Sequence, residues 1–489
     1  MVSVPTYAQA QVNFQTRMLT LATPLVMGVL LSGCITSHDK PVEKALDDPA
    51  ALGLSATPAP AANSEWWSAY RDPQLDRLLR EALTGSPTLA QSLARERKAQ
   101  ADAAAVQTVS WPLITYDAFG IRKRFSDHDP VPPIVAGKQK WLGSQGFNLS
   151  WDLDFWGRQA ALIAQADARS DASAFDSAGA RLSIAGAVVR SYLALDRAYA
   201  LADVAERSQQ QRQEILGITQ RRLKAGLDTR VEQRQAEGAV WDARVELTQL
   251  LAERERIVHL LAALAGQGAT AHSKIERPRM QTDGVLLLPD SLSIDLLVRR
   301  PDVLAARSRI ASAHAGLRAA RAAFYPDINL LAFAGTSAIG FDNLFNGSSR
   351  TFGIGSALHL PVFDAGRLKA LYRGSAAEVD LAVDAYNQTV LAAVQETADQ
   401  ISDISSLDTA IEQQHQSVDA AEDAFSLATE RYRAGLTTYL SVLITESAVL
   451  SARRQLVTMV TARNIARVTL LIDVGGDFQL PRALEPVVH

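Results

Sequence analysis

The sequence repeats itself at a fixed spacing, and this feature constrains its fold more than any other. Gly157 and Gly366 are 209 residues apart, and so are Gly226 and Gly435. The strings around the second pair also match, RLKAGLDTRV at 222–231 against RYRAGLTTYL at 431–440. Such self-similarity predicts an architecture built from two copies of one structural unit.

Each copy has the pattern of helices, a pair of strands, a long helical hairpin and a further helix. We predict the first unit at 63–270 and the second at 271–475, followed by a C-terminal tail at 476–489. The predicted strands are 113–124 and 143–155 in the first unit, and 327–336 and 351–363 in the second.

The clearest strand alternates aromatic or aliphatic residues, from Phe147 to Phe155, with Asn148, Ser150, Asp152 and Asp154. A half-buried strand of a soluble protein can show this pattern. A transmembrane strand must show it, because one face meets lipid and the other meets water. We interpret Asp152 and Asp154 as part of a polar channel wall rather than as a catalytic acid and base.

The helical segments exceed the length of ordinary globular helices, which predicts coiled-coil packing. We predict a helical hairpin at 157–226, with a break near 196–200, and its counterpart at 366–435. Each arm would have roughly 35 residues and a length of about 50 Å. Further helices are predicted at 228–265, 300–323 and 437–471.

Four strands cannot close a barrel, since even small membrane barrels need about eight and an open edge in lipid leaves backbone groups unpaired. The chain must therefore associate with copies of itself. Three copies would supply twelve strands, enough for a water-filled passage, and their hairpins would extend that passage as a helical tube.

The N-terminal region is predicted to be removed or to serve as an anchor. Residues 18–33 form an apolar stretch of secretory length, too short to span a bilayer, and we predict a signal peptide at 1–33. It ends at Leu-Ser-Gly-Cys, where Cys34 is the only cysteine in the chain. This resembles a bacterial lipoprotein site, so Cys34 is the predicted lipidation site and 34–62 a tether. The alternative is an ordinary signal peptide followed by a buried cysteine, and translation could also begin at Met18.

Composition excludes several functions. The formal net charge is −4 and neither half is strongly basic, so no nucleic-acid partner is expected. One cysteine and eight scattered histidines give no grouping typical of a metal site, and we expect neither a metal nor another cofactor. The sequence has no nucleophile motif and no phosphate-binding loop, so we do not expect an enzyme.

Several motifs resemble one family of bacterial channels. They are LPDSLSIDLLVRRPDVLAARSRI at 288–310, RAAFYPDINLLAFAG at 321–335, WDLDFWGR at 151–158, LPVFDAGR at 360–367 and RYRAGL at 431–436. In these the chain resembles the outer-membrane factor (TolC-like) family of tripartite efflux pumps, in particular its lipoprotein branch. The resemblance covers nearly everything after Cys34.

The resemblance implies an α+β membrane protein, in which a trimeric transmembrane β-barrel with four strands per chain continues into a long periplasmic α-helical barrel. It implies an outer-membrane channel, lipid-anchored, with a large periplasmic part, that passively conducts drugs or other small molecules. The implied partners are a periplasmic adaptor protein and an inner-membrane transporter, of the RND type. The loops 125–140 and 339–350 would then be extracellular.

The resemblance also implies an acidic constriction near a hairpin tip. Counting back from Gly435 places Asp399 and Asp403 there, four residues apart and therefore on one helix face. The 209-residue offset maps Asp399 onto Arg190, which predicts an ion pair between hairpins. The alternative for these carboxylates is an ordinary solvated helix face. For the whole chain, the main alternative is a lipid-anchored periplasmic coiled-coil scaffold without a channel, and the second is a secreted enzyme.

Overall fold

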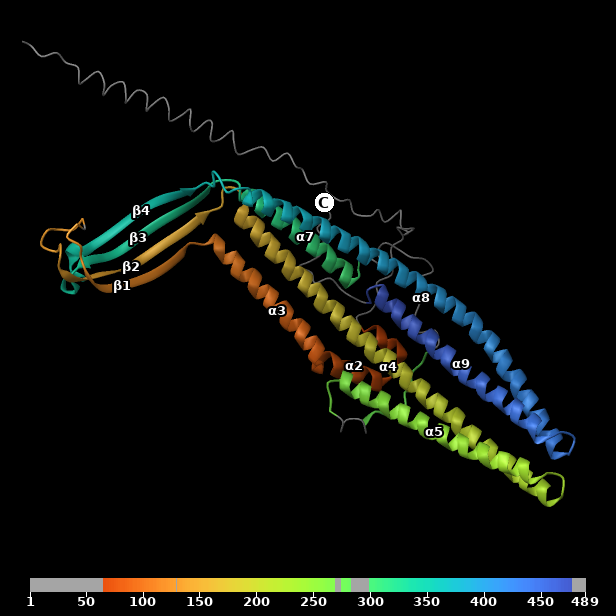
Figure 1. The fold of residues 1–489 in the computed structure, drawn as a ribbon. Helices are drawn as coiled ribbons and strands as arrows, with labels where there is room; N and C mark the ends of the chain where they lie inside the picture. Colours follow the sequence, from red (N-terminus) through yellow and green to blue (C-terminus); the bar gives the residue numbers. More distant parts are fainter. Residues whose placement is uncertain (1–64, 129, 269–273, 283–298, 477–489) are drawn as a thin grey trace, which may run out of the picture. The chain divides into compact units, whose positions relative to one another are not determined.

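A computed structural model describes residues 65–128, 130–268, 274–282 and 299–476 (Figure 1). The predicted signal peptide, the tether with Cys34, and the tail beyond residue 476 lie outside these residues. The α+β prediction is confirmed, because the described chain is mostly helical and contains one four-stranded antiparallel sheet. No described helix is long and apolar enough to cross a membrane.

The elements follow the order expected for a duplicated chain. The helices are α2 (Pro73–Gly85), α3 (Pro87–Gln107), α4 (Arg158–Lys224), α5 (Arg230–Leu264), α7 (Pro301–Ala322), α8 (Arg367–Arg433) and α9 (Tyr439–Asp473). The strands are β1 (Leu113–Arg124), β2 (Gln139–Leu153), β3 (Asp327–Ile339) and β4 (Arg350–His359). The short 3-10 helix η2 (Trp66–Tyr70) precedes α2.

The chain divides into two compact units. Among the described residues, one unit comprises Lys98–Ser170 and Ser308–Asp384, and it holds the sheet. The other comprises Asp171–Arg307, the residues from Ala385 onward and the segment that ends at Arg97. Both copies of the repeat contribute to each unit, so the duplication does not correspond to two separate domains.

The sheet is an antiparallel meander in the order β1-β2-β3-β4 (Figure 1). β2 and β3 are central and join the two copies of the repeat, with Phe147 opposite Ala334 and Trp151 opposite Leu330. β1 and β4 form the two edges. β4 ends at His359 rather than at the predicted residue 363, because Pro361 has no backbone N–H to donate to a neighbouring strand.

The predicted helical hairpins within 157–226 and 366–435 were wrong. α4 and α8 are each one continuous helix of 67 residues, without a break near 196–200. The chain turns instead at Gly226 and Gly435, which have positive φ values of 72° and 80°. Glycine adopts this left-handed conformation at low cost and ends helices for that reason. The hairpins are therefore α4–α5 and α8–α9, and each second arm has 35 residues.

The largest hydrophobic core lies in the second unit, where α2, α4 and α5 pack together around Leu79, Val189 and Leu261. Asp72 fixes the start of α2 there. One carboxylate oxygen accepts a hydrogen bond from the backbone N–H of Gln74 at 2.9 Å, and the other accepts from the Tyr192 hydroxyl at 2.8 Å. The helix start is thus joined directly to the middle of α4.

Candidate channel wall and hairpin-tip lock

The register of the sheet separates its side chains into two faces. Residues directly opposite each other in an antiparallel pair point to the same side. One face is predominantly aromatic and aliphatic, and its apolar members include Ile114, Tyr116, Phe147, Leu149, Trp151, Leu153, Ile328, Leu330, Ala332, Ala334, Phe352, Ile354 and Leu358. Several of them are largely exposed, including Phe352 at 83% and Ile354 at 79%. An apolar face this exposed needs an apolar surrounding.

The opposite face carries a hydrogen-bonded polar network, and its large apolar residues are Leu113, Phe119, Ile121, Leu142, Leu331, Phe333 and Ile339. Asn148 donates to the Asp117 carboxylate at 2.7 Å, and the Thr115 hydroxyl donates to the same oxygen at 3.0 Å. The Asn329 amide donates to Ser150 at 3.0 Å and also to Asp152. These side chains satisfy one another across three strands, which suits a wall in contact with water.

Asp154 does not belong to this wall, contrary to the prediction. β2 ends at Leu153, and the Asp154 carboxylate accepts a hydrogen bond from the backbone N–H of Ala160 at 2.8 Å, at the start of α4. Asp364 has the same role at the start of α8, where it accepts from the N–H of Leu368 at 2.8 Å. That hydrogen bond, with others from the backbone, holds the pKa of Asp364 below its ordinary value. Both carboxylates satisfy backbone donors that a helix start leaves unpaired.

The tips of the two hairpins are joined by one arginine. Arg222, near the end of α4, donates two hydrogen bonds to Asp228 in its own turn, at 3.0 and 3.1 Å. Its third contact goes to the other hairpin, where it donates to the backbone carbonyl of Tyr432 at 2.7 Å. The Arg222 guanidinium also lies 4.6 Å from the centre of the Tyr432 ring.

The phenol of Tyr432 completes this network. Its hydroxyl donates to the Asp228 carboxylate at 2.5 Å and lies 3.1 Å from the Thr219 hydroxyl. The side chains of Arg222 and Asp228 are only 11% and 7% exposed. We call Arg222, Asp228, Tyr432 and Thr219 the tip lock, because together they join α4 and the α4–α5 turn to α8.

The electrostatics of the tip lock favour the ionised carboxylate. Burial on its own would raise the pKa of the Asp228 carboxyl, but the hydrogen bonds from Arg222 and Tyr432 outweigh burial and hold that pKa below its ordinary value. Burial, followed by the hydrogen bond to Asp228, raises the pKa of the Tyr432 phenol to about 12. At neutral pH the lock therefore consists of an arginine cation, a carboxylate and a neutral phenol.

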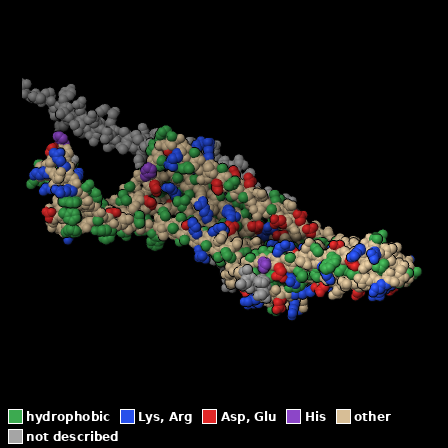
Figure 2. All heavy atoms as spheres, turned by 60° about the horizontal axis from the view of Figure 1, so that its bottom comes forward, with side chains coloured by type: hydrophobic (Ala, Val, Ile, Leu, Met, Phe, Trp, Pro, Cys, Tyr) green, Lys and Arg blue, Asp and Glu red, His purple; other side chains and the backbone are tan. Residues whose placement is uncertain are grey.

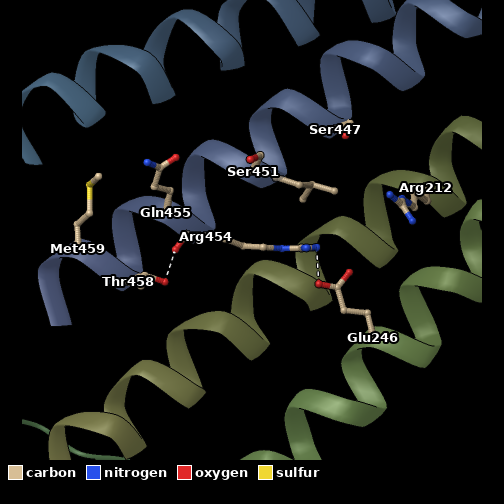
Figure 3. A pocket seen from close by; sticks show the side chains of 9 residues that line it. Arg212, Glu246, Ser447, Ser451, Arg454, Gln455, Thr458 and Met459 are labelled. Carbon is tan, nitrogen blue, oxygen red and sulfur yellow. Dashed lines mark hydrogen bonds and ion pairs between the residues drawn. The ribbon is translucent and has the colours of Figure 1, made fainter. Parts of the chain in front are cut away.

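A second contact between the hairpins lies further from the tips. Arg212 of α4 donates to Glu446 of α9 at 2.9 Å and to the Ala239 carbonyl of α5 at 2.9 Å. Next to it is an open groove of about 690 Å³, shown in Figure 3, which Arg454 crosses to pair with Glu246. The groove is lined mainly by polar side chains, among them Ser447, Ser451, Gln455 and Thr458. Burial raises the pKa of Glu446, although Arg212 opposes that shift.

Comparison with known protein families identifies the architecture. The profile of the outer membrane efflux protein family matches residues 78–267 and 292–476, which include the sheet and both hairpins. The chain belongs to the outer membrane efflux protein family. This confirms the resemblance to outer-membrane factors seen in the sequence, and the family is one of channel proteins.

Individual relatives agree with this family. The fusaric acid resistance protein FusA of Burkholderia cepacia is 33% identical over 357 residues, covering 71% of this chain and 67% of that protein. The multidrug resistance outer membrane protein MdtP of Shigella flexneri is 29% identical over 493 residues, covering 97% of this chain and 99% of that protein. The crystal structure of the outer membrane protein VceC of Vibrio cholerae superposes with a TM-score of 0.81 at 32% identity, covering 86% of this chain and all of that chain.

The acidic residues predicted for the constriction lie elsewhere in this family member. Asp399 and Asp403 are exposed residues in the middle of α8, 34 and 30 residues before its end at Arg433. At about 1.5 Å per residue they are roughly 45–50 Å along the helix from the tip. Their placement at a tip was wrong, because it assumed that the 366–435 segment folds back on itself.

Arg190 lies near the end of α9, close enough to Asp473 to favour the ionised form of that carboxyl. The same region contains Arg300, the residue before the start of α7. Arg300 is buried and donates to Asp302 at 2.8 Å, to Glu396 of α8 at 2.9 Å and to the Asp473 carbonyl at 2.9 Å. We call Arg300, Asp302, Glu396 and Asp473 the Arg300 cluster.

Sequence reasoning missed the tip lock. Its one signal was the difference between the two matching strings, where Asp228 of the first corresponds to Thr437 of the second, and Tyr432 of the second corresponds to Leu223 of the first. Where two copies of a repeat carry different residues at equivalent positions, a residue of one copy can pair with a residue of the other.

Proposed function

We propose that three copies of this chain form an outer-membrane channel, the exit duct of a tripartite efflux pump. The observation that carries this proposal is a four-stranded sheet with a predominantly apolar face, an opposite face that carries a polar network, and two free edges, β1 and β4. In lipid each edge must pair, and joining β4 of one copy to β1 of the next satisfies both. The apolar face then meets lipid and the polar network of Asp117 and Asp152 lines the passage.

The duct conducts passively in this proposal, and its energy comes from elsewhere. We infer a periplasmic adaptor protein as direct partner and an inner-membrane transporter of the RND type as energy source. The family match and the relatives named for multidrug and fusaric acid resistance support this role. The cargo is then drugs or other small organic molecules, passing from the periplasm to the exterior.

The narrowing of the duct is assigned to the hairpin tips, where the tip lock holds the two hairpins of each copy together. An adaptor that binds the separated tips more tightly than the locked tips would shift the population toward the open state. Asp399 and Asp403 retain a smaller role in this proposal, as an acidic belt partway along α8 that attracts cations.

The experiment that tests the channel is a conductance measurement in planar bilayers, paired with dye accumulation in a strain whose own exit duct is deleted. A channel predicts discrete conductance steps and restored dye efflux when adaptor and transporter are present. The alternative, a periplasmic scaffold without a channel, predicts neither. The family match favours the channel.

Topology is tested separately, with a cysteine introduced at Gly347 in the β3–β4 loop and with the unaltered chain as the control for labelling at Cys34. On intact cells an impermeant thiol reagent should label it, because the helices that leave the other end of the sheet are periplasmic in this proposal. Labelling only after lysis would reverse the orientation.

The lipid anchor is a further part of the proposal and rests on the Leu-Ser-Gly-Cys string. Cys34→Ser should abolish incorporation of labelled palmitate and leave the precursor uncleaved at this site. Palmitate labelling that persists in this variant would refute the anchor while leaving the channel untouched, since the barrel provides a second attachment to the membrane.

A further inference from the structure

Cationic side chains at the loop end of the sheet are divided between its two faces by the strand register. Arg122 lies opposite Trp141 and Arg124 opposite Gln139, whereas Lys123 lies opposite Lys140. Because successive residues of a strand alternate between faces, the two arginines share one face and the two lysines share the other. All four side chains are exposed.

The arginines are on the apolar face. From Arg122 toward the helix end of β1, the residues on the same face are Gly120, Ala118 and Tyr116. The apolar stretch begins at Tyr116, which lies opposite Phe147. Arg350 at the start of β4 is on this face too, because it lies opposite Thr336, which lies opposite Gln145. All three arginines are therefore at the loop side of the apolar stretch. Figure 2 shows Lys and Arg side chains gathered at this end of the sheet, at the left of the view, beside hydrophobic ones.

Aromatic side chains accompany the arginines. Trp141, opposite Arg122, packs edge-on against Phe341 of the β3–β4 loop with 5.9 Å between ring centres. Gly120 and Gly143 make room for that loop, since side chains there would contact Phe341 and Leu344. The loop thus lies against the same face, and Phe345 is 70% exposed on it. Aromatic and basic side chains next to an apolar band are typical of the level where lipid headgroups meet hydrocarbon.

The three arginines lie on opposite edges of the sheet, with Arg122 and Arg124 on β1 and Arg350 on β4. Closure of the proposed barrel brings β4 of one copy beside β1 of the next. Both strands have their loop ends on the same side, so Arg350 of one copy and Arg122 and Arg124 of its neighbour come to one seam. This step rests on the proposed function, and each site is incomplete without a second copy.

We propose that these seams bind the phosphorylated headgroups of lipids in the outer leaflet, one site at each seam. Guanidinium groups bind phosphate oxygens through paired hydrogen bonds, and their position beside apolar and aromatic side chains lets the same lipid place its acyl chains on the sheet. The ligand is a membrane lipid rather than free phosphate, because the cluster adjoins an apolar face instead of a polar pocket.

The test is native mass spectrometry of the detergent-purified assembly with bisphosphorylated lipid A as the probe. We compare the wild type with R122Q/R124Q, with R350Q and with K123Q/K140Q. The last removes the same number of charges as the first, from the same end of the sheet but from the other face. Each spectrum also reports whether the variant still assembles, and bilayer conductance reports whether it still forms a channel.

We expect up to three lipids per assembly, and a loss of affinity of roughly 10- to 30-fold in R122Q/R124Q, given typical gains for basic side chains at anionic surfaces. R350Q should lose affinity by several-fold, and K123Q/K140Q should change it by less than about twofold on the same basis. Removing both phosphates from the probe should abolish the difference between wild type and R122Q/R124Q.

Equal losses in the arginine and lysine variants would overturn the proposal, since they would indicate only a general effect of charge. So would displacement of the lipid by millimolar inorganic phosphate, which would indicate a site for free phosphate. An assembled, conducting channel that binds lipid A no better than its dephosphorylated form would refute this inference and leave the proposed function standing. A chain that neither assembles nor conducts would refute the proposed function itself.

Discussion

Two arginines with little exposed surface hold distant elements together, and their surroundings differ. Arg222 joins the two copies of the repeat, whereas Arg300 joins the start of α7 to α8 and α9 within the second copy. In the tip lock, the Asp228 carboxylate receives three hydrogen bonds, two from Arg222 and one from Tyr432. In the Arg300 cluster, Arg300 donates to the carboxylates of Asp302 and Glu396, which are about half exposed, and to the backbone carbonyl of Asp473. One oxygen of the Asp473 carboxylate is buried there without a hydrogen-bond partner.

The difference appears in the direction of the pKa shifts. The pKa of Asp228 is lowered, because its hydrogen bonds outweigh the cost of burial. Burial raises the pKa of Asp473 to about 6, and Glu396 and Asp302 add to this, although Arg300 and Arg190 act in the opposite direction. A buried charge is stable only when its hydrogen-bonding capacity is filled, so the tip lock is the stronger of the two contacts at neutral pH.

The largest effect should follow from breaking the tip lock. Asp228→Ala leaves the Arg222 guanidinium buried without its carboxylate, which typically costs about 3–5 kcal/mol. We expect a lower unfolding temperature and a higher single-channel conductance, because the hairpin tips are no longer held together. Asp242→Ala, an exposed aspartate of α5, is the matched control. An unchanged conductance in Asp228→Ala would place the narrowing away from the tips.

Arg300→Met should have a smaller effect and lower the free energy of unfolding by about 1–3 kcal/mol. The half-exposed carboxylates of Asp302 and Glu396 can then bind water instead, and only the Asp473 carbonyl loses a buried hydrogen-bond donor. Conductance should stay at the wild-type value, since the cluster is far from the tips along α8 and α9. Arg307→Met, which changes an exposed arginine of α7, controls for the loss of charge. A conductance increase in Arg300→Met would contradict the distinction between a lock at the tips and a structural junction.

The features that were predictable from the sequence depend on local pattern. Alternation over Phe147–Leu153 requires a strand, and the spacing of Gly226 and Gly435 fixes two equivalent turns. The hairpin error came from reading these glycines as the ends of complete hairpins. The segment around 196–200, Asp-Arg-Ala-Tyr-Ala, contains neither glycine nor proline, the two residues that most disfavour a continuous helix.

The features that were not predictable depend on contacts between distant parts of the chain. Tyr432 and Asp228 are 204 residues apart, and no periodicity relates them. The 209-residue offset relates equivalent positions, which occupy similar places in different hairpins and need not touch. Arg190 illustrates this limit, because it is equivalent to Asp399 but lies near Asp473.

Asp473 predicts a dependence of stability on pH. Its folded pKa of about 6 is above its ordinary value of 3.8, so the folded state binds the proton more tightly, and its contribution to stability increases as pH falls through 6. Allowing for solvent screening, the effect is about 1–2 kcal/mol between pH 7.5 and pH 5. Asp473→Asn should unfold at a higher temperature than the wild type at pH 7.5 and lose that advantage at pH 5. Asp419→Asn, which changes an exposed aspartate of α8, is the control. A difference in unfolding temperature between Asp473→Asn and the wild type that is the same at both pH values would show that Asp473 does not titrate in this range.

The smallest effect is expected from the acidic pair that the sequence favoured as a gate. Asp399 and Asp403 are exposed on α8, so their neutralisation should leave the unfolding temperature within the small range typical of surface changes, about 0.5 kcal/mol. If they face the passage, Asp399→Asn with Asp403→Asn weakens block by divalent cations without raising the conductance of the unblocked channel.

The control for this pair is Glu412→Gln with Asp419→Asn, two exposed carboxylates of the same helix. At about 100° per residue they point roughly opposite to Asp399, toward the outside of the tube when Asp399 points inside. Cation block that weakens only in the Asp399 and Asp403 variant assigns that face of α8 to the passage. Equal cation block in both variants and the wild type would show that Asp399 and Asp403 lie on a solvated outer face. A higher conductance in the Asp399 and Asp403 variant would place the gate in the middle of α8 and contradict its assignment to the tips.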